Sequence, residues 1–288
     1  MAEEKGVKEA KAKKWADPVA ATIDPASRQM IERAHELGVE TAFDRAVTMK
    51  PCNIGTQGIC CKNCGMGPCR LPLPKGGIEG EDARKGICGA TPNTIAARNF
   101  IRMIAGGAAA HSDHGRSVAE VFMSAARKET DAYKIKDTRK LLEVAQWLGV
   151  ETTVEVDGKQ LDRDIDEIAV EVGEKALNEW GKAEGELLFA KRAPEARYKI
   201  WKDRGVVPRN IDREIVEIMH RTHIGVDQDY KNLMKQGTRA AIADGWGGSM
   251  LATELQDILF GTPYPVASEA NLGVMKEDMV NIVIHGHE

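Results

Sequence analysis

Residues 52–70 read CNIGTQGICCKNCGMGPCR, and residues 86–90 read GICGA. Together these stretches hold all six cysteines of the chain, which are Cys52, Cys60, Cys61, Cys64, Cys69 and Cys88. Glycine and proline are frequent throughout residues 50–90, which indicates loops. A glycine-rich loop can wrap a metal and turn its amides toward sulfur, because no Cβ stands in the way. The segment therefore predicts a metal site built by loops.

Four of the cysteines have the spacing of an iron–sulfur cluster. Cys61 and Cys64 form a C-x₂-C pair, Cys69 follows after four residues, and Cys88 comes from a later loop. Four thiolates around one centre suit a [4Fe–4S] cluster. Structural zinc is the alternative, since it also takes four thiolates. The 18 residues between Cys69 and Cys88 do not form a zinc knuckle, and this favours iron–sulfur.

Cys52 and Cys60 remain outside that set. Two thiolates cannot complete a second four-iron cluster in one chain, but two chains that meet at a twofold axis supply four. We interpret the pair as half of a cluster shared across a homodimer. The alternative is that both are buried or accessory cysteines. Disulfides are disfavoured in a reducing cytosol, and Cys60 and Cys61 are adjacent.

Composition limits the possible functions of the chain. With 288 residues, 42% of them hydrophobic, it can bury a core, and its content of Ala, Glu, Lys, Arg and Met favours helix. The net charge of −4 does not indicate a nucleic-acid-binding protein, which would carry an excess of basic residues. No apolar stretch reaches the ~20 residues of a membrane span. The charged N-terminal sequence has no apolar signal core, so we expect a cytoplasmic protein.

Helix signals recur along most of the chain, and a strand signal comes near its end. Helices are predicted after the Asp24-Pro25 cap, which Gly38 can end, after Thr91-Pro92 and after a cap at Asp212. Further helical patterns cover 40–49, 118–126, 164–182, 227–243 and 252–260. The β-branched run Val280–Ile284 indicates a buried parallel strand. We predict a mainly α fold with a flexible tail (1–22), a helical iron–sulfur domain (23–262) and the start of an α/β, Rossmann-like domain (263–288).

The cysteine run resembles the nickel-containing carbon monoxide dehydrogenases of anaerobes. The pattern C-x₇-CC-x₂-C-x₄-C-R, with GICGA and TIAAR after it, is similar to theirs. The later segments AAAHSDHG, AYKIKD, EIMHRTHIGVD, DILFGTP, SEANLGV and NIVIHGHE are also similar, in the same order. The resemblance implies a helical N-terminal domain with two clusters. In it Cys61, Cys64, Cys69 and Cys88 hold a cluster within the subunit, and Cys52 and Cys60 hold one that bridges two subunits.

The resemblance also implies a reaction, CO + H₂O ⇌ CO₂ + two protons + two electrons, at a nickel–iron–sulfur cluster. Electrons would leave through the two other clusters to a ferredoxin-like acceptor, and an acetyl-CoA synthase subunit is a further candidate partner. His287, in HGH, matches the ligand to an iron of the catalytic cluster. The remaining ligands would be cysteines beyond Glu288. We therefore expect either the N-terminal part of a subunit about twice this length or a truncated gene product.

His111 and His114 are three residues apart on a predicted helix, hence on one face. The resemblance implies a histidine series that carries protons from the catalytic site to solvent, with Ser117 in place of a third histidine. The alternative is that both histidines pack against neighbouring helices. Three functions remain open: part of a carbon monoxide dehydrogenase, a non-catalytic dimeric iron–sulfur redox module, and a zinc-bound structural domain.

Overall fold

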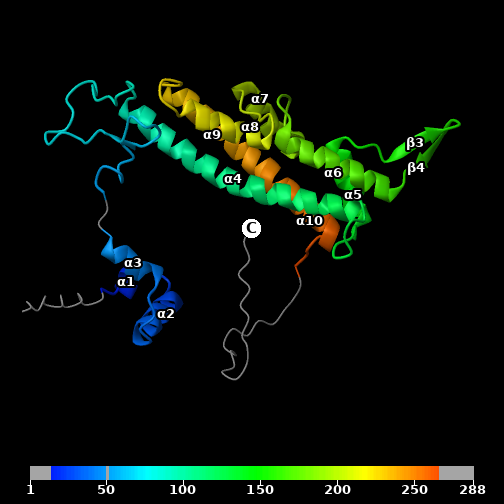
Figure 1. The fold of residues 1–288 in the computed structure, drawn as a ribbon, viewed down its shortest axis with the longest axis horizontal. Helices are drawn as coiled ribbons and strands as arrows, with labels where there is room; N and C mark the ends of the chain where they lie inside the picture. Colours follow the sequence, from blue (N-terminus) through cyan, green and yellow to red (C-terminus); the bar gives the residue numbers. More distant parts are fainter. Residues whose placement is uncertain (1–13, 50–51, 266–288) are drawn as a thin grey trace, which may run out of the picture. The chain divides into compact units, whose positions relative to one another are not determined.

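The computed structural model describes residues 14–49 and 52–265, and this part of the chain is mainly helical, as predicted (Figure 1). It divides into two compact units. Of the described residues, the first contains 14–49, 52–99 and His223–Tyr230, and the second contains Phe100–Thr222 and 231–265. The predicted strand Val280–Ile284 and the α/β start lie outside the described residues.

Three short helices open the first unit: α1 (Pro18–Ala21), α2 (Pro25–Glu36) and α3 (Ala42–Thr48). The Asp24 cap is confirmed, since its side chain accepts the N–H of Ser27 at 2.6 Å. Asp17 and Pro18 repeat the same signal one helix earlier. Folded structure therefore begins before residue 22, inside the stretch that the sequence predicts to be a tail.

Residues 52–90 are mostly loop, with one short antiparallel pair of strands, β1 (Cys60–Cys61) and β2 (Cys69–Arg70). The long helix α4 (Pro92–Ala126) follows. The sequence predicts a separate helix at 118–126, but α4 runs through the small-residue stretch without a break. At Gly115 a small residue is needed, because a Cβ there would lie 2.6 Å from the carbonyl oxygen of Gly248 and 2.9 Å from Trp180.

The elements after α4 are mostly helices. In chain order they are α5 (Thr138–Leu148), β3 (Thr153–Val156), β4 (Lys159–Asp162), α6 (Ile165–Gly181), the 3₁₀ turn η1 (Leu188–Arg192), α7 (Glu195–Arg204), α8 (Ile211–Arg221), α9 (Tyr230–Ala243), the π-helix η2 (Asp244–Ser249) and α10 (Met250–Phe260). The predicted helix over 164–182 is confirmed as α6. The predicted cap at Asp212 is wrong, because the side chain of Asn210 accepts the N–H of Arg213 at 2.7 Å and caps α8.

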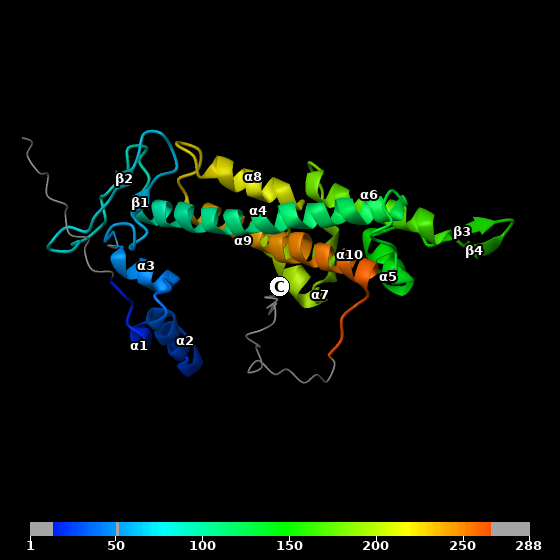
Figure 2. The ribbon, with the colours of Figure 1, turned by 60° about the horizontal axis from the view of Figure 1, so that its bottom comes forward.

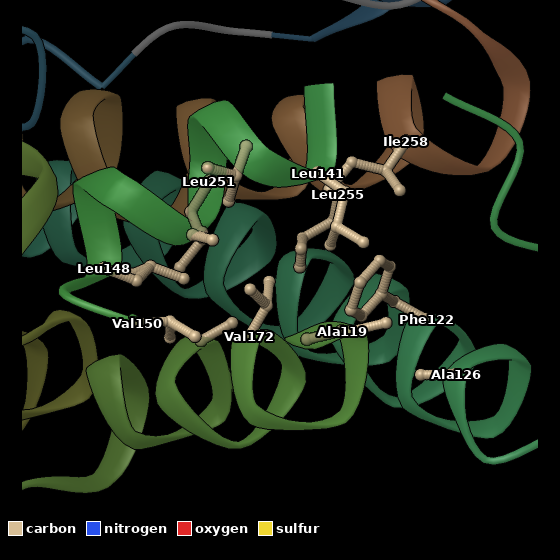
Figure 3. Packing of buried hydrophobic residues seen from close by; sticks show 14 of the residues in the cluster. Ala119, Phe122, Ala126, Leu141, Leu148, Val150, Val172, Leu251, Leu255 and Ile258 are labelled. Carbon is tan, nitrogen blue, oxygen red and sulfur yellow. The ribbon is translucent and has the colours of Figure 1, made fainter. Parts of the chain in front are cut away.

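Apolar side chains from α4, α5, α6 and α10 form the main core of the second unit (Figure 3). Phe122, Leu141, Val172 and Leu255 are fully buried there. Each such side chain stabilises the fold by roughly 1.5–3 kcal/mol relative to exposure. This core fixes the C-terminal part of α4 against α10, within two turns of the histidines on α4. Within the described residues, no helix is both long and apolar enough to cross a membrane.

Candidate metal centre

The short strands β1 and β2 lie side by side (Figure 2). Their register places Cys61 opposite Cys69. The turn between the strands is tight: the N–H of Gly67 donates to the carbonyl of Cys64 at 3.3 Å. A Cβ on Gly67 would lie 3.0 Å from the carbonyl oxygen of Cys61 and 3.2 Å from the amide nitrogen of Cys69. A side chain at position 67 would therefore crowd the backbone of this turn, which keeps Cys64 beside the strand pair.

The loop that carries Cys88 packs directly against Cys69. The N–H of Ile87 donates to Sγ of Cys69 at 3.5 Å, and a Cβ on Gly86 would lie 3.5 Å from the same sulfur. Cys61, Cys69 and Cys88 share one small apolar cluster, together with Ile54, Ile59, Leu71, Ala90 and Ile95. Three of the four predicted ligands of the intrasubunit cluster are thus brought together, and Cys64 lies at the adjoining turn.

Cys88 has the most polarised surroundings of the four. Arg98 Nη1 lies 3.6 Å from its Sγ, and Gln228 Nε2 lies 3.8 Å from it. Burial opposes ionisation of the thiol. Hydrogen bonds from Arg98, the Ala90 amide and Gln228 outweigh this effect and lower the pKa of Cys88 to about 7. Because the thiolate is the metal-binding form, this environment favours ligation near neutral pH.

Cys52 and Cys60 have different surroundings. Cys52 is exposed, and the amide of Gly55 donates to its Sγ at 3.5 Å. This hydrogen bond, one from the Ile54 amide, and the charges of Arg70 and Lys62 lower the pKa of Cys52. Cys60 is half-buried, and its strand partner is Arg70. Arg70 thus lies beside Cys60 in the strand pair, and its charge also favours the thiolate of Cys52.

His111 and His114 lie on α4, as predicted, and both line a pocket of about 440 Å³ whose other walls include Gly248, Ser249 and Gln256. His111 Nδ1 lies 2.7 Å from Oδ1 of Asp244, at the start of η2. Ser117 lines a second pocket that also includes Gln256. Its hydroxyl donates back to the carbonyl of Asp113 at 3.1 Å.

The four-thiolate set fits a [4Fe–4S] cluster on three observations. All six cysteines are free thiols. N–H donors lie at the sulfurs of Cys69 and Cys88, as bound cluster sulfur requires. Asn63, between Cys61 and Cys64, has a buried Nδ2 with no hydrogen-bond partner. The thiols are near one another but not yet in metal-binding geometry: across the described ranges, no three His, Cys, Asp or Glu side chains are placed to hold a metal ion.

Sequence reasoning missed Arg98, Gln228 and Asp244, and His287 lies outside the described residues. Two of these three residues lie in or directly after segments that carry the family resemblance. Arg98 ends the TIAAR segment, and Gln228 directly follows IGVD. The signal for Arg98 was a cation ten residues from a predicted ligand, on the face of a helix that starts beside it.

Comparison with known proteins decides the family. The model of the Prismane/CO dehydrogenase family matches residues 59–288. The chain belongs to this family. Carbon monoxide dehydrogenase 1 of Methanosarcina mazei is 51% identical over 269 residues, which are 93% of this chain and 41% of that protein. This chain of the Prismane/CO dehydrogenase family therefore spans about two fifths of the length of such relatives.

Two solved structures of family members are similar. One is the as-isolated, nickel-free carbon monoxide dehydrogenase of Thermococcus sp. AM4, with a TM-score of 0.79 and 47% identity over 92% of this chain and 40% of that one. The other is an acetyl-CoA synthase/carbon monoxide dehydrogenase, described for NiZn[Fe₄S₄] and NiNi[Fe₄S₄] clusters in its alpha subunits. Its TM-score is 0.74, with 39% identity over 89% of this chain and 37% of that one.

Proposed function

We propose that this chain is the electron-transfer and dimerisation part of a carbon monoxide dehydrogenase, which converts CO and water to CO₂, two protons and two electrons. One observation carries the proposal. Cys61, Cys69 and Cys88 lie in one group of packed apolar residues, with N–H donors at the sulfurs of Cys69 and Cys88. The chain that holds them is 51% identical to a carbon monoxide dehydrogenase over 93% of its length. We further propose that residues 23–262 act as the helical iron–sulfur domain and that 263–288 begin an α/β domain.

The thiolates of Cys61, Cys64, Cys69 and Cys88 would hold a [4Fe–4S] cluster, which supplies one-electron transfer when bound. The chain's own task is to present four ionised sulfurs and to keep water from them. Burial of Cys61 and the apolar packing around it serve the second task. The hydrogen bonds to Cys88 serve the first, because they stabilise negative charge on its sulfur.

Cys52 and Cys60 would provide half of the ligands of a cluster shared by two copies of the chain. Exposure of Cys52 leaves its sulfur accessible to a second copy. The lowered pKa of Cys52 favours the thiolate that such a cluster needs. Arg70, beside Cys60, would offset part of the charge that four thiolates bring together.

His287 would bind an iron of the nickel–iron–sulfur catalytic cluster, as its position in the HGH motif suggests. His111 and His114 would carry protons away from that cluster. Asp244 accepts a hydrogen bond from Nδ1 of His111, so Nε2 is the ring nitrogen that would exchange a proton. Two pockets along α4, one lined by both histidines and one by Ser117, share Gln256 in their linings and would give room for water.

A ferredoxin-like protein would accept the electrons, since a one-electron cluster chain needs a one-electron carrier. An acetyl-CoA synthase subunit is a proposed partner because a similar solved structure is that of an acetyl-CoA synthase/carbon monoxide dehydrogenase. Six free thiols are consistent with a reducing cytoplasm.

The test is anaerobic purification followed by analysis of metal, sulfide and CO-dependent viologen reduction. We expect a brown protein that contains iron and sulfide. We expect CO-dependent viologen reduction from a polypeptide of the relatives' length but not from these 288 residues alone. A colourless protein with stoichiometric zinc would establish a structural zinc domain instead. An iron-loaded protein of the relatives' length that never responds to CO would establish a redox module without catalysis.

A further inference from the structure

Arg98 is a buried cation next to the predicted ligand Cys88. Its side chain lies on α4 and is only 1% exposed. Nη1 lies 3.6 Å from Sγ of Cys88, and Nη2 donates to the carbonyl of Asp227 at 2.8 Å. All three residues belong to the first unit. The guanidinium is therefore fixed between a backbone carbonyl and a sulfur.

The charge of Arg98 has no carboxylate partner in the part of the chain that the structure describes. Within residues 14–49 and 52–265, no ion pair joins Arg98 to Asp or Glu, and its buried Nε has no hydrogen-bond acceptor. A guanidinium stays charged at any physiological pH. Buried charges are almost always paired, because an unpaired one loses its hydration without compensation. The group that can balance the charge of Arg98 is therefore the thiolate of Cys88, together with the negative charge of the cluster that this thiolate would bind.

Hydrogen bonds hold residues 227–228 so that a second donor, Gln228, reaches the sulfur of Cys88. Thr94 lies one helical turn before Arg98, and its hydroxyl donates to the carbonyl of Gln228 at 2.7 Å. Gln228 Nε2 in turn donates to the carbonyl of Cys88 at 3.0 Å and lies 3.8 Å from its Sγ. Thr94 and Arg98 thus hold residues 227–228 in place, and Gln228 adds a neutral donor beside the cation.

We propose that Arg98, with Gln228 in support, sets the reduction potential of the cluster held by Cys61, Cys64, Cys69 and Cys88. This inference rests on the proposed iron–sulfur site. One electron enters the oxidised cluster from a donor and adds one negative charge, while Arg98 neither gains nor loses a proton. The buried guanidinium stabilises that added charge, so it raises the potential and makes the cluster a better electron acceptor.

The test is an EPR-monitored redox titration of the iron-loaded protein, with iron content measured on each sample. We expect Arg98→Met to weaken electron uptake at least tenfold, which is a fall in potential of ~59 mV for one electron. Arg98→Lys should recover part of the loss, because lysine restores the positive charge but lacks the planar, multiply donating guanidinium. Arg102→Met is the matched control. Arg102 lies one turn further along α4 and donates to Thr222 at 2.8 Å rather than to a sulfur.

An unchanged potential in Arg98→Met at wild-type iron content would overturn the proposal. If Arg98→Met binds no iron, Gln228→Leu decides instead. Gln228 is exposed, so its replacement leaves the fold intact, and it should lower the potential by less than tenfold. No shift in that variant would also overturn the proposal. A wild-type protein without iron would instead refute the iron–sulfur site itself, so the two failures are distinguishable.

Discussion

His111 Nδ1 lies 2.7 Å from Oδ1 of Asp244, and this contact ties the middle of α4 to the first residue of the π-helix η2. Short π-helical turns are rare and occur often at functional sites. As an acceptor, the carboxylate selects the tautomer of His111 that carries its proton on Nδ1. Nε2 is then the proton acceptor. Asp244 is therefore a positioning residue for the proposed proton relay.

The tautomer gives a direct prediction. In the neutral state, Asp244→Leu should let His111 populate the Nε2–H tautomer, because Nδ1 has lost its acceptor. Asp244→Asn keeps an acceptor oxygen and should preserve the Nδ1–H form. Imidazole ¹⁵N chemical shifts distinguish the two tautomers. Identical tautomer ratios in the wild type and in Asp244→Leu would show that the carboxylate does not select the tautomer.

Two glycines of α4 should respond oppositely to alanine. Gly115→Ala places a Cβ 2.6 Å from the carbonyl oxygen of Gly248, which is backbone and cannot easily move. We expect it to lower the free energy of unfolding by ~1–3 kcal/mol. Gly107→Ala meets nothing within 4 Å and should raise it by ~0.5–1 kcal/mol.

Urea unfolding followed by far-UV circular dichroism checks both values. Gly107→Ala is the control, because it makes the same chemical change in the same helix without the close contact. If Gly115→Ala proved as stable as Gly107→Ala, the close approach of α4 to Gly248 would not exist in solution.

The acid sensitivity of the α1–α3 helices can be predicted from Asp44. Burial alone would raise the pKa of Asp44. Hydrogen bonds from the Ala16 amide at 2.7 Å, from Thr41 and from His35 outweigh burial and hold the pKa well below its ordinary value of 3.8. Since folding lowers this pKa, the carboxylate stabilises the folded state above pH 3.8. That contribution is lost as the pH falls from 3.8 toward the folded-state pKa.

Hydrogen exchange of α2 and α3 amides, corrected for intrinsic rates, measures this effect. Protection should be constant from pH 7 down to about 5 and should fall steeply below the ordinary carboxyl pKa. Asp44→Asn should be less protected at pH 7 and should show a flatter pH dependence. Equal pH dependence in the two proteins would mean that another group controls the acid response.

Local sequence patterns predicted the features that depend on local chemistry. The Asp24-Pro25 cap and the amphipathic pattern of α6 follow from their own residues, and both were correct. The hairpin β3–β4 was missed, although its Asp157-Gly158 turn, with φ of 52° and 74°, is a typical hairpin signal. The cap of α8 was misassigned because Asn210 and Asp212 both suit an N-cap, and only backbone geometry separates them.

The surroundings of the candidate ligands could not be predicted in the same way. Cysteine spacing indicates which thiols act together, because neighbouring ligands come from one loop. Gln228 is 140 residues from Cys88 and reaches it only through tertiary structure. The same holds for His111 and Asp244, which are 133 residues apart. Spacing therefore indicates candidate ligands, whereas the groups that would stabilise charge on those ligands emerge only from the fold.

The central claim is that each chain holds one complete set of cluster ligands and half of another. Anaerobic iron and sulfide analysis of the wild type and of Cys52→Ser/Cys60→Ser, with the mass of each species in solution, tests it most directly. We predict a wild-type dimer and a variant that loses about two irons per chain while it keeps about four. Unchanged iron content in the variant, or a monomeric wild type with iron only at the complete set, would contradict the account.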